Sequence, residues 1–251
     1  MILLPIKLTF LMIQRMYGQA DSSSTSSSYN SVRSNHSIAI AAIGSLSVGG
    51  LIDIATGKSL SMTENSPTSL AIIFRALDLY ASPLGLLCIV IATFFWFRGS
   101  KQFLRWFDIV LALAMIALLN NLAGLIVSIF DPKVKAAFLL LSASLVYVEN
   151  IVVFVAFYWR FDHQWQERIS AGEKTIPAVL FPQNTISQDL LHGWRPSFID
   201  YLFLSFNTAS TFGPTLPIPL RPSIHIGMMM QVSIAMAVLI MIAARAIGLI
   251  A

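Results

Sequence analysis

Long apolar runs constrain this chain more than any other feature of its sequence. A helix that crosses a bilayer needs ~20 mostly apolar residues, and four runs of this kind are bounded by charged or turn-forming residues: 70–97, 107–130, 136–159 and 223–250. A fifth run, 37–55, contains three glycines and Asp53, and its small residues suit close packing against another helix. We therefore expect an all-α membrane protein with about five transmembrane helices.

Composition and charge support this fold class. Hydrophobic residues make up 56% of the chain and charged residues only 11%, which is outside the range of soluble domains. The net charge of +4 comes from residues spread between the apolar runs. Such charges fit basic loops at a membrane surface better than a nucleic-acid-binding patch. We therefore expect the lipid bilayer as a partner and no nucleic acid.

Three regions follow along the chain. Residues 1–36 combine an interrupted apolar start with the serine-rich segment DSSSTSSSYNSVRSN, which cannot bury a core. A cleaved signal peptide and a surface-lying or disordered tail both remain open for the start of this region. Residues 37–135 hold the N-terminal transmembrane helices. Residues 136–251 hold two spanning helices joined by a long connection, 160–222, in which 162–170 is expected to form a short amphipathic helix.

The end of the connection has an unusual pattern, FIDYLFLSFNTASTFGPTLPIPL at 198–220. Pro196 suits a helix start at Ser197, and residues 198–208 have helical apolar spacing over ~16 Å, about half a bilayer. Hydroxyl residues, a glycine and several prolines follow. Irregular backbone at membrane depth persists only where protein or a water-filled cavity satisfies its polar groups. We therefore expect a re-entrant half helix and loop before the last spanning helix.

The run TASTFG, residues 208–213, resembles the filter region of two-helix potassium channels, which reads Thr-x-x-Thr-Val-Gly-Tyr-Gly-Asp. In those channels, filter carbonyls replace the hydration shell of the ion. The segments FPQ (181–183), GWRPSFIDYLFLSFNTASTFGPT (193–215), MMMQ (228–231) and AARA (243–246) resemble an uncharacterised family of small bacterial integral membrane proteins with such a C-terminal unit. This resemblance implies the bacterial inner (plasma) membrane. Residues 214–216 read Pro-Thr-Leu in place of Tyr-Gly-Asp, so potassium selectivity is not expected.

Two functions of different classes follow from this pattern. In the first, a homo-oligomer, a tetramer if the unit is a channel, forms a weakly selective pore for monovalent cations. In the second, the protein is a non-conducting membrane scaffold or partner subunit, and the re-entrant hairpin only closes the bundle. The predicted pore-lining residues of the first function are Thr208, Ser210, Thr211, Phe212, Gly213 and, on the last helix, Gln231.

Enzymatic and cofactor functions are not expected. The sequence has no nucleophile elbow, phosphate loop or paired catalytic carboxylates. His163, His192 and His225 are not spaced as metal ligands. Aromatic residues at the ends of the apolar runs, such as Tyr158 and Trp159, are predicted to lie at the headgroup level.

Polar side chains inside the predicted spans are the second feature, after the re-entrant pattern, that bears on structure and function. Polar groups at membrane depth are costly and usually face the bundle interior with a partner. We expect Glu149 to pair with Arg245 or with the asparagines and so to join helices. A functional alternative makes Glu149 a cation-binding or proton-accepting site. The predicted intramembrane network consists of Asn120, Asn121, Glu149, Asn150 and Arg245.

Overall fold

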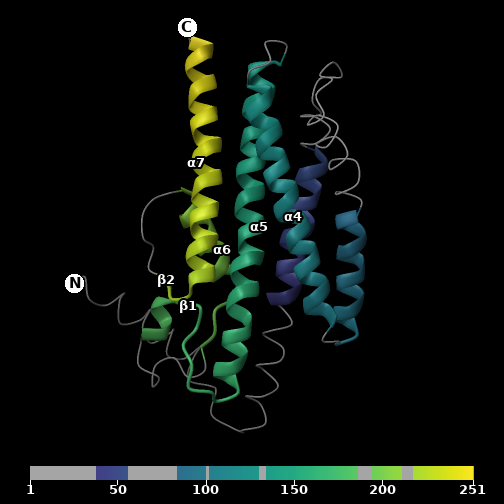
Figure 1. Cartoon of the computed structure of the whole chain (residues 1–251), viewed down its shortest axis with the longest axis vertical. Helices are drawn as coiled ribbons and strands as arrows, with labels where there is room; N and C mark the ends of the chain where they lie inside the picture. The colour runs from purple at the N-terminus through teal and green to yellow at the C-terminus, as the bar shows by residue number, and fades with distance from the viewer. Residues whose placement is uncertain are drawn as a thin grey trace, which may run out of the picture. The chain divides into compact units, whose positions relative to one another are not determined.

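The computed structural model describes residues 38–55, 84–99, 102–129, 134–185, 194–210 and 217–250 (Figure 1). The chain divides into the units Met1–Ala39 and Ile40–Ala251, and nearly all described residues belong to the second. The predicted tail, 1–36, lies outside the described residues, and so does 211–216 of the predicted loop.

Among the described residues, four helices are long and apolar enough to cross a membrane: Ile38–Ala55, α4 (Gln102–Ser128), α5 (Ala136–Ser170) and α7 (Pro222–Ile250), in which the candidate span is Pro222–Arg245. A shorter apolar helix, Leu84–Phe97, matches the second half of the predicted span 70–97. The first half of that span lies outside the described residues. The prediction of a helical, membrane-embedded protein is confirmed, and the described residues contain four candidate spans, where about five were expected for the whole chain.

α5 is longer than predicted. It contains 35 residues, or ~52 Å at 1.5 Å per residue, and so exceeds the ~30 Å hydrocarbon core. No glycine or proline interrupts it, and the segment 162–170, predicted as a separate amphipathic helix, continues it. The helix ends where Gly172 adopts a φ of 83° and the Glu173 amide donates to the Arg168 carbonyl at 3.0 Å. This is the usual glycine-dependent helix end.

α6 (Phe198–Ser210) begins where the sequence predicted. The Ser197 amide and hydroxyl both donate to Oδ2 of Asp200, at 2.6 and 2.7 Å, which fixes the first turn in the manner of a capping box. β1 (Val179–Leu180), followed by the short helix η1 (Pro182–Thr185), pairs antiparallel with β2 (Ile218–Pro219). The residues before α7 therefore lie beside the connection that follows α5.

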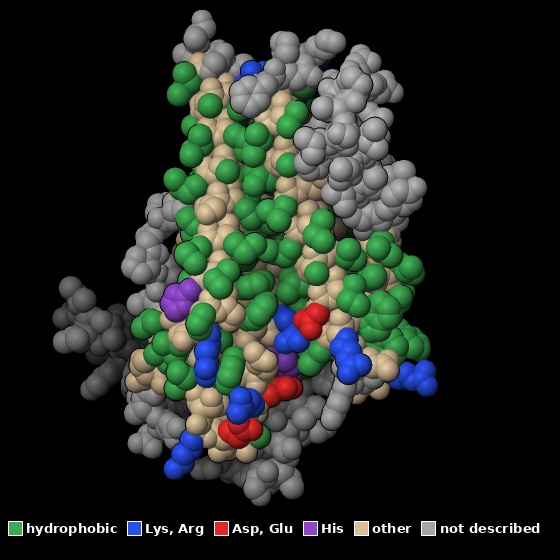
Figure 2. All heavy atoms as spheres, in the orientation of Figure 1, with side chains coloured by type: hydrophobic (Ala, Val, Ile, Leu, Met, Phe, Trp, Pro, Cys, Tyr) green, Lys and Arg blue, Asp and Glu red, His purple; other side chains and the backbone are tan. Residues whose placement is uncertain are grey.

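α5 is the central helix of the described unit. In its apolar stretch 56% of the residues are buried, against 33% in α4 and 28% in α7, because α4, α6 and α7 all pack on it. At the α5–α7 contact, Gly227 lies against the ring of Phe157. Figure 2 shows hydrophobic side chains along the helices, with charged side chains gathered toward the β1–β2 end of the face in view.

Candidate functional site

A buried amide holds α6 between α5 and α7. Gln231, on α7, is fully buried. Its Nε2 donates to the carbonyl and hydroxyl oxygens of Ser205 on α6, at 3.0 and 2.8 Å. Its Oε1 accepts a hydrogen bond from the Tyr158 hydroxyl on α5, at 2.7 Å. One side chain therefore joins three helices, and we call Gln231, Tyr158, Ser205 and Asn150 the Gln231 cluster.

Two further bonds complete the Gln231 cluster. The Ser205 hydroxyl donates to the Ile151 carbonyl at 2.7 Å, and Nδ2 of Asn150 donates to the Gln231 carbonyl at 3.3 Å. Polar groups at membrane depth need such partners, because the hydrocarbon supplies none. The cluster therefore fixes α6 against α5 and α7, and with it the place where α6 ends.

The structure describes the predicted pore-lining residues only in part. At the end of α6, the Thr208 hydroxyl donates at 2.8 Å to a backbone carbonyl one turn earlier, and the Ser210 hydroxyl does so at 3.1 Å. The other three residues of the run, Thr211, Phe212 and Gly213, lie outside the described residues.

Three residues discussed in the sequence analysis make their contacts inside the chain. Gln231 was expected to line a shared axis, but its amide faces α5 and α6 of its own chain, where its hydrogen bonds are made. Tyr158 and Trp159, which were predicted at the headgroup level, are buried within the chain, with 0% and 2% of their surface exposed. No signal in the sequence singled out Ser205 or Tyr158 as polar partners.

A buried carboxylate anchors the connection at the first turns of α6. Asp162, on α5, accepts a hydrogen bond from the Tyr201 hydroxyl of α6 at 2.7 Å. It also accepts the backbone N–H groups of Ala178 and Val179 at 2.7 and 3.2 Å. Val179 opens β1, which pairs with β2. One carboxylate thereby holds the start of α6 and the strand pair that precedes α7 at the same end of α5.

A second polar cluster joins three other elements. Nδ2 of Asn121, on α4, donates to Oδ1 of Asp53 at 3.0 Å and to Oε2 of Glu149 at 2.9 Å. Asp53 comes from the helix Ile38–Ala55 and Glu149 from α5, and all three side chains are buried. Glu149 therefore bonds one of the asparagines expected as its partner. Asp53 was not among the candidates, although it is the one charged residue in its apolar run. We call these three residues the carboxylate cluster.

The other expected partner of Glu149 lies elsewhere. Arg245 donates to the Val134 carbonyl at 3.1 Å, about 20 Å from Glu149 along the chain direction of α5. Glu149 and Asn150 are neighbours in sequence and point ~100° apart on a helix, so they enter different clusters. Asn120 is buried on α4. Of the five residues predicted as one network, Asn121 and Glu149 therefore belong to the carboxylate cluster and Asn150 to the Gln231 cluster, while Arg245 lies apart from both.

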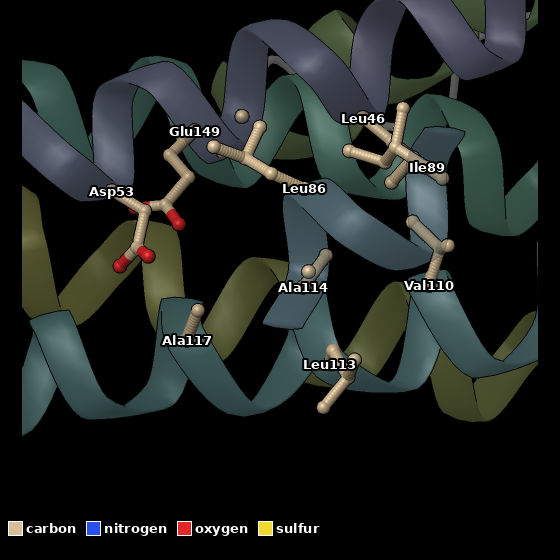
Figure 3. A pocket seen from close by; sticks show the side chains of 12 residues that line it. Leu46, Asp53, Leu86, Ile89, Val110, Leu113, Ala114, Ala117 and Glu149 are labelled. Carbon is tan, nitrogen blue, oxygen red and sulfur yellow. The ribbon is translucent and has the colours of Figure 1, made fainter. Parts of the chain in front are cut away.

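A small cavity opens beside the carboxylate cluster (Figure 3). Asp53 and Glu149 form its polar wall, and small or apolar residues of the surrounding helices form the rest. The cavity leaves a volume of about 30 Å³ for the centres of water molecules. This is room for one or two water molecules. Within the described ranges, no group of three or more His, Cys, Asp or Glu side chains is arranged to hold a metal ion.

Two polar clusters and one short, anchored helix are thus the features from which a function can be inferred. In comparisons with known proteins, no protein family, curated protein or solved structure matches this chain. Function is therefore inferred from the geometry and chemistry of these features alone.

Proposed function

We propose that the protein forms an oligomeric, weakly selective pore for monovalent cations, to which each copy contributes α5, α6 and α7. Several copies, four in the expected arrangement, would surround a common axis in the bacterial inner membrane, with no enzymatic activity and no cofactor. The position of α6 carries the proposal. This 13-residue helix covers only ~20 Å, begins at the Asp162 anchor and packs Ala209 against Ile151, near the middle of α5.

The chemistry of a helix end at that depth supports a cation path. The last four carbonyls of a helix lack intrahelical partners and carry a partial negative charge of about half an elementary charge. Such an end is costly in hydrocarbon, but beside a water-filled path it stabilises a cation. The last turn of α6 contains no basic residue that would cancel this charge. The proposed path is lined by hydroxyl and carbonyl groups of residues 208–213.

The strand pair supports a re-entrant course. Because Asp162 holds both the first turns of α6 and the start of β1, and β2 pairs with β1, the chain enters α6 and reaches α7 at the same end of α5. A helix that crossed the bilayer completely would deliver the following residues to the opposite end.

α6 also leaves an apolar face free for neighbours. Ile199, Phe203 and Phe206 expose 66%, 51% and 51% of their surface. In the proposed oligomer these side chains pack against other copies. In a monomeric protein they contact lipid.

A non-conducting scaffold is the second candidate, and the Gln231 cluster favours it. The hydrogen bonds of Gln231 are made within one chain, so its amide contributes to closing the bundle whether or not other copies are present. In the scaffold, the segment after α6 would be shielded from water, like the Gln231 amide.

Cysteine labelling separates the two candidates. Cys88 is the only cysteine, so Cys88→Ser gives a cysteine-free background. On that background, a membrane-impermeant thiol reagent should modify Thr211→Cys in vesicles if residues 208–213 line a water-filled path. It should leave two controls unmodified: Ser205→Cys, inside the Gln231 cluster, and Ile240→Cys, on the exposed apolar face of α7. Protection of Thr211→Cys equal to that of the controls would contradict the pore and leave the scaffold.

A further inference from the structure

Glu149 is a buried carboxylate to which the described residues offer no positive charge. It is 1% exposed, and its hydrogen bond of 2.9 Å comes from the neutral amide of Asn121. A carboxylate removed from water without a counter-charge is strongly unfavourable, and it is relieved by binding a cation or a proton.

The groups around Glu149 add negative charge. Asp53 lies opposite and accepts from the same Asn121 nitrogen, so the two carboxylates are close neighbours. The nearest other charged residues on α4 and α5 are Asp108 and Arg160, about three turns away, where they pair with each other at 2.6 Å.

The other elements that the structure describes bring no charged group to this place. On α7, Arg245 bonds the Val134 carbonyl, and His225 lies in the first turn, at the end where the helix leaves the strand pair. The helix Leu84–Phe97 contributes glycine and aliphatic side chains to the cavity and contains no charged residue. Among the described residues, Asp53 is therefore the titratable group that faces Glu149.

The cavity favours a proton over a metal ion. Figure 3 shows the carboxylates of Asp53 and Glu149 next to each other, with aliphatic side chains such as Leu46 and Val110 farther along the wall. Hard metal cations take about six or more oxygen ligands, which this wall does not supply. A proton needs a single acceptor, and the space of about 30 Å³ admits the water that would deliver it.

We propose that Glu149 is a proton-exchange site that works together with Asp53. Uptake converts the Glu149 carboxylate to a carboxyl group, whose O–H donates to an Asp53 oxygen or to water in the cavity. Release returns the proton to that water, and the charge of the pair changes by one. Glu149 lies on α5, but its partners Asp53 and Asn121 belong to helices outside α5, α6 and α7, so the site does not depend on the proposed pore.

Infrared spectroscopy of the reconstituted full-length protein tests this site. The spectrum recorded at low pH minus that at high pH should contain a carboxyl carbonyl band from a group shielded from bulk water. Glu149→Gln keeps an oxygen that accepts from Asn121 and should lose this band. Asp108→Asn, which removes a half-exposed surface carboxylate, should keep it. The same band in wild type and in folded Glu149→Gln would overturn the proposal.

A labelling experiment on the wild-type chain covers the case in which Glu149→Gln does not fold. Dicyclohexylcarbodiimide adds to protonated carboxyl groups within membranes, and mass spectrometry of peptides locates the adduct. We expect an adduct on Glu149 whose yield falls as the pH rises and does not change with sodium concentration. Absence of the adduct, or a yield independent of pH, would overturn the proposal. Protection by sodium at constant pH would also overturn it, in favour of a metal-cation site.

Discussion

Replacing Tyr158 with phenylalanine removes one hydroxyl from the Gln231 cluster and leaves the Gln231 Oε1 atom without its 2.7 Å donor. Gln231 is fully buried, so no water takes the place of that donor. A buried acceptor left unsatisfied costs about 1–3 kcal/mol, while measured hydrogen bonds between membrane helices average about 0.6 kcal/mol. We therefore expect Tyr158→Phe to lower the free energy of unfolding by about 1–2 kcal/mol.

A double-mutant cycle isolates this bond. Gln231→Met has a similar length but no amide, and once it is present Tyr158→Phe should cost less, with a coupling of about 1 kcal/mol. The matched control is Tyr147→Phe on the same helix, which should change stability by less than about 0.5 kcal/mol. Unfolding in mixed detergent micelles, followed by circular dichroism, measures all four variants. A coupling near zero, or equal losses for Tyr158→Phe and Tyr147→Phe, would refute the role given to the Gln231 cluster.

Two other changes test the packing and the anchor. Gly227→Ala places a Cβ in steric overlap with the Phe157 ring, so overpacking of about 1–3 kcal/mol should outweigh the ~0.5–1 kcal/mol gained in helix propensity. The control Gly44→Ala, with no atom within 4 Å of the new Cβ, should be neutral or stabilising in the same unfolding experiment. An equal loss of stability in both variants would contradict the α5–α7 contact. Asp162→Asn keeps one oxygen that can accept the two backbone N–H groups, but it replaces the other oxygen, which accepts from Tyr201, with an NH2 donor. It should cost about 2–3 kcal/mol and speed limited proteolysis of the connection, and unchanged cleavage would show that the anchor is not needed.

The sequence predicted the helices well because their signals are local. Run length and hydropathy found the spans, and the start of α6 followed from Pro196 and Ser197. The end of α5 was missed because hydropathy falls at Arg160, although the chain reaches Gly172 before any glycine or proline can end the helix. The length of α5 was therefore set by the first glycine that can end the helix, and not by the fall in hydropathy.

The partners of the buried polar groups were less predictable. Glu149 and Gln231 were recognised as unusual, but which residues they bond depends on the rotation and register of helices far apart in sequence. Gln231 meets Ser205 and Tyr158 across 26 and 73 positions, and periodicity within one helix contains no such information. Asp53 was recognisable as the single charge in its run, but not as the neighbour of Glu149.

Cation flux from liposomes tests the proposed pore most directly. Wild-type protein should release potassium and sodium at similar rates, well above empty liposomes. Gly213→Val should abolish this flux, because it alters the run proposed to line the path, and Thr175→Val, on the connection, should not. Wild-type flux equal to that of empty liposomes, from protein shown to be folded, would contradict the pore and leave the non-conducting scaffold.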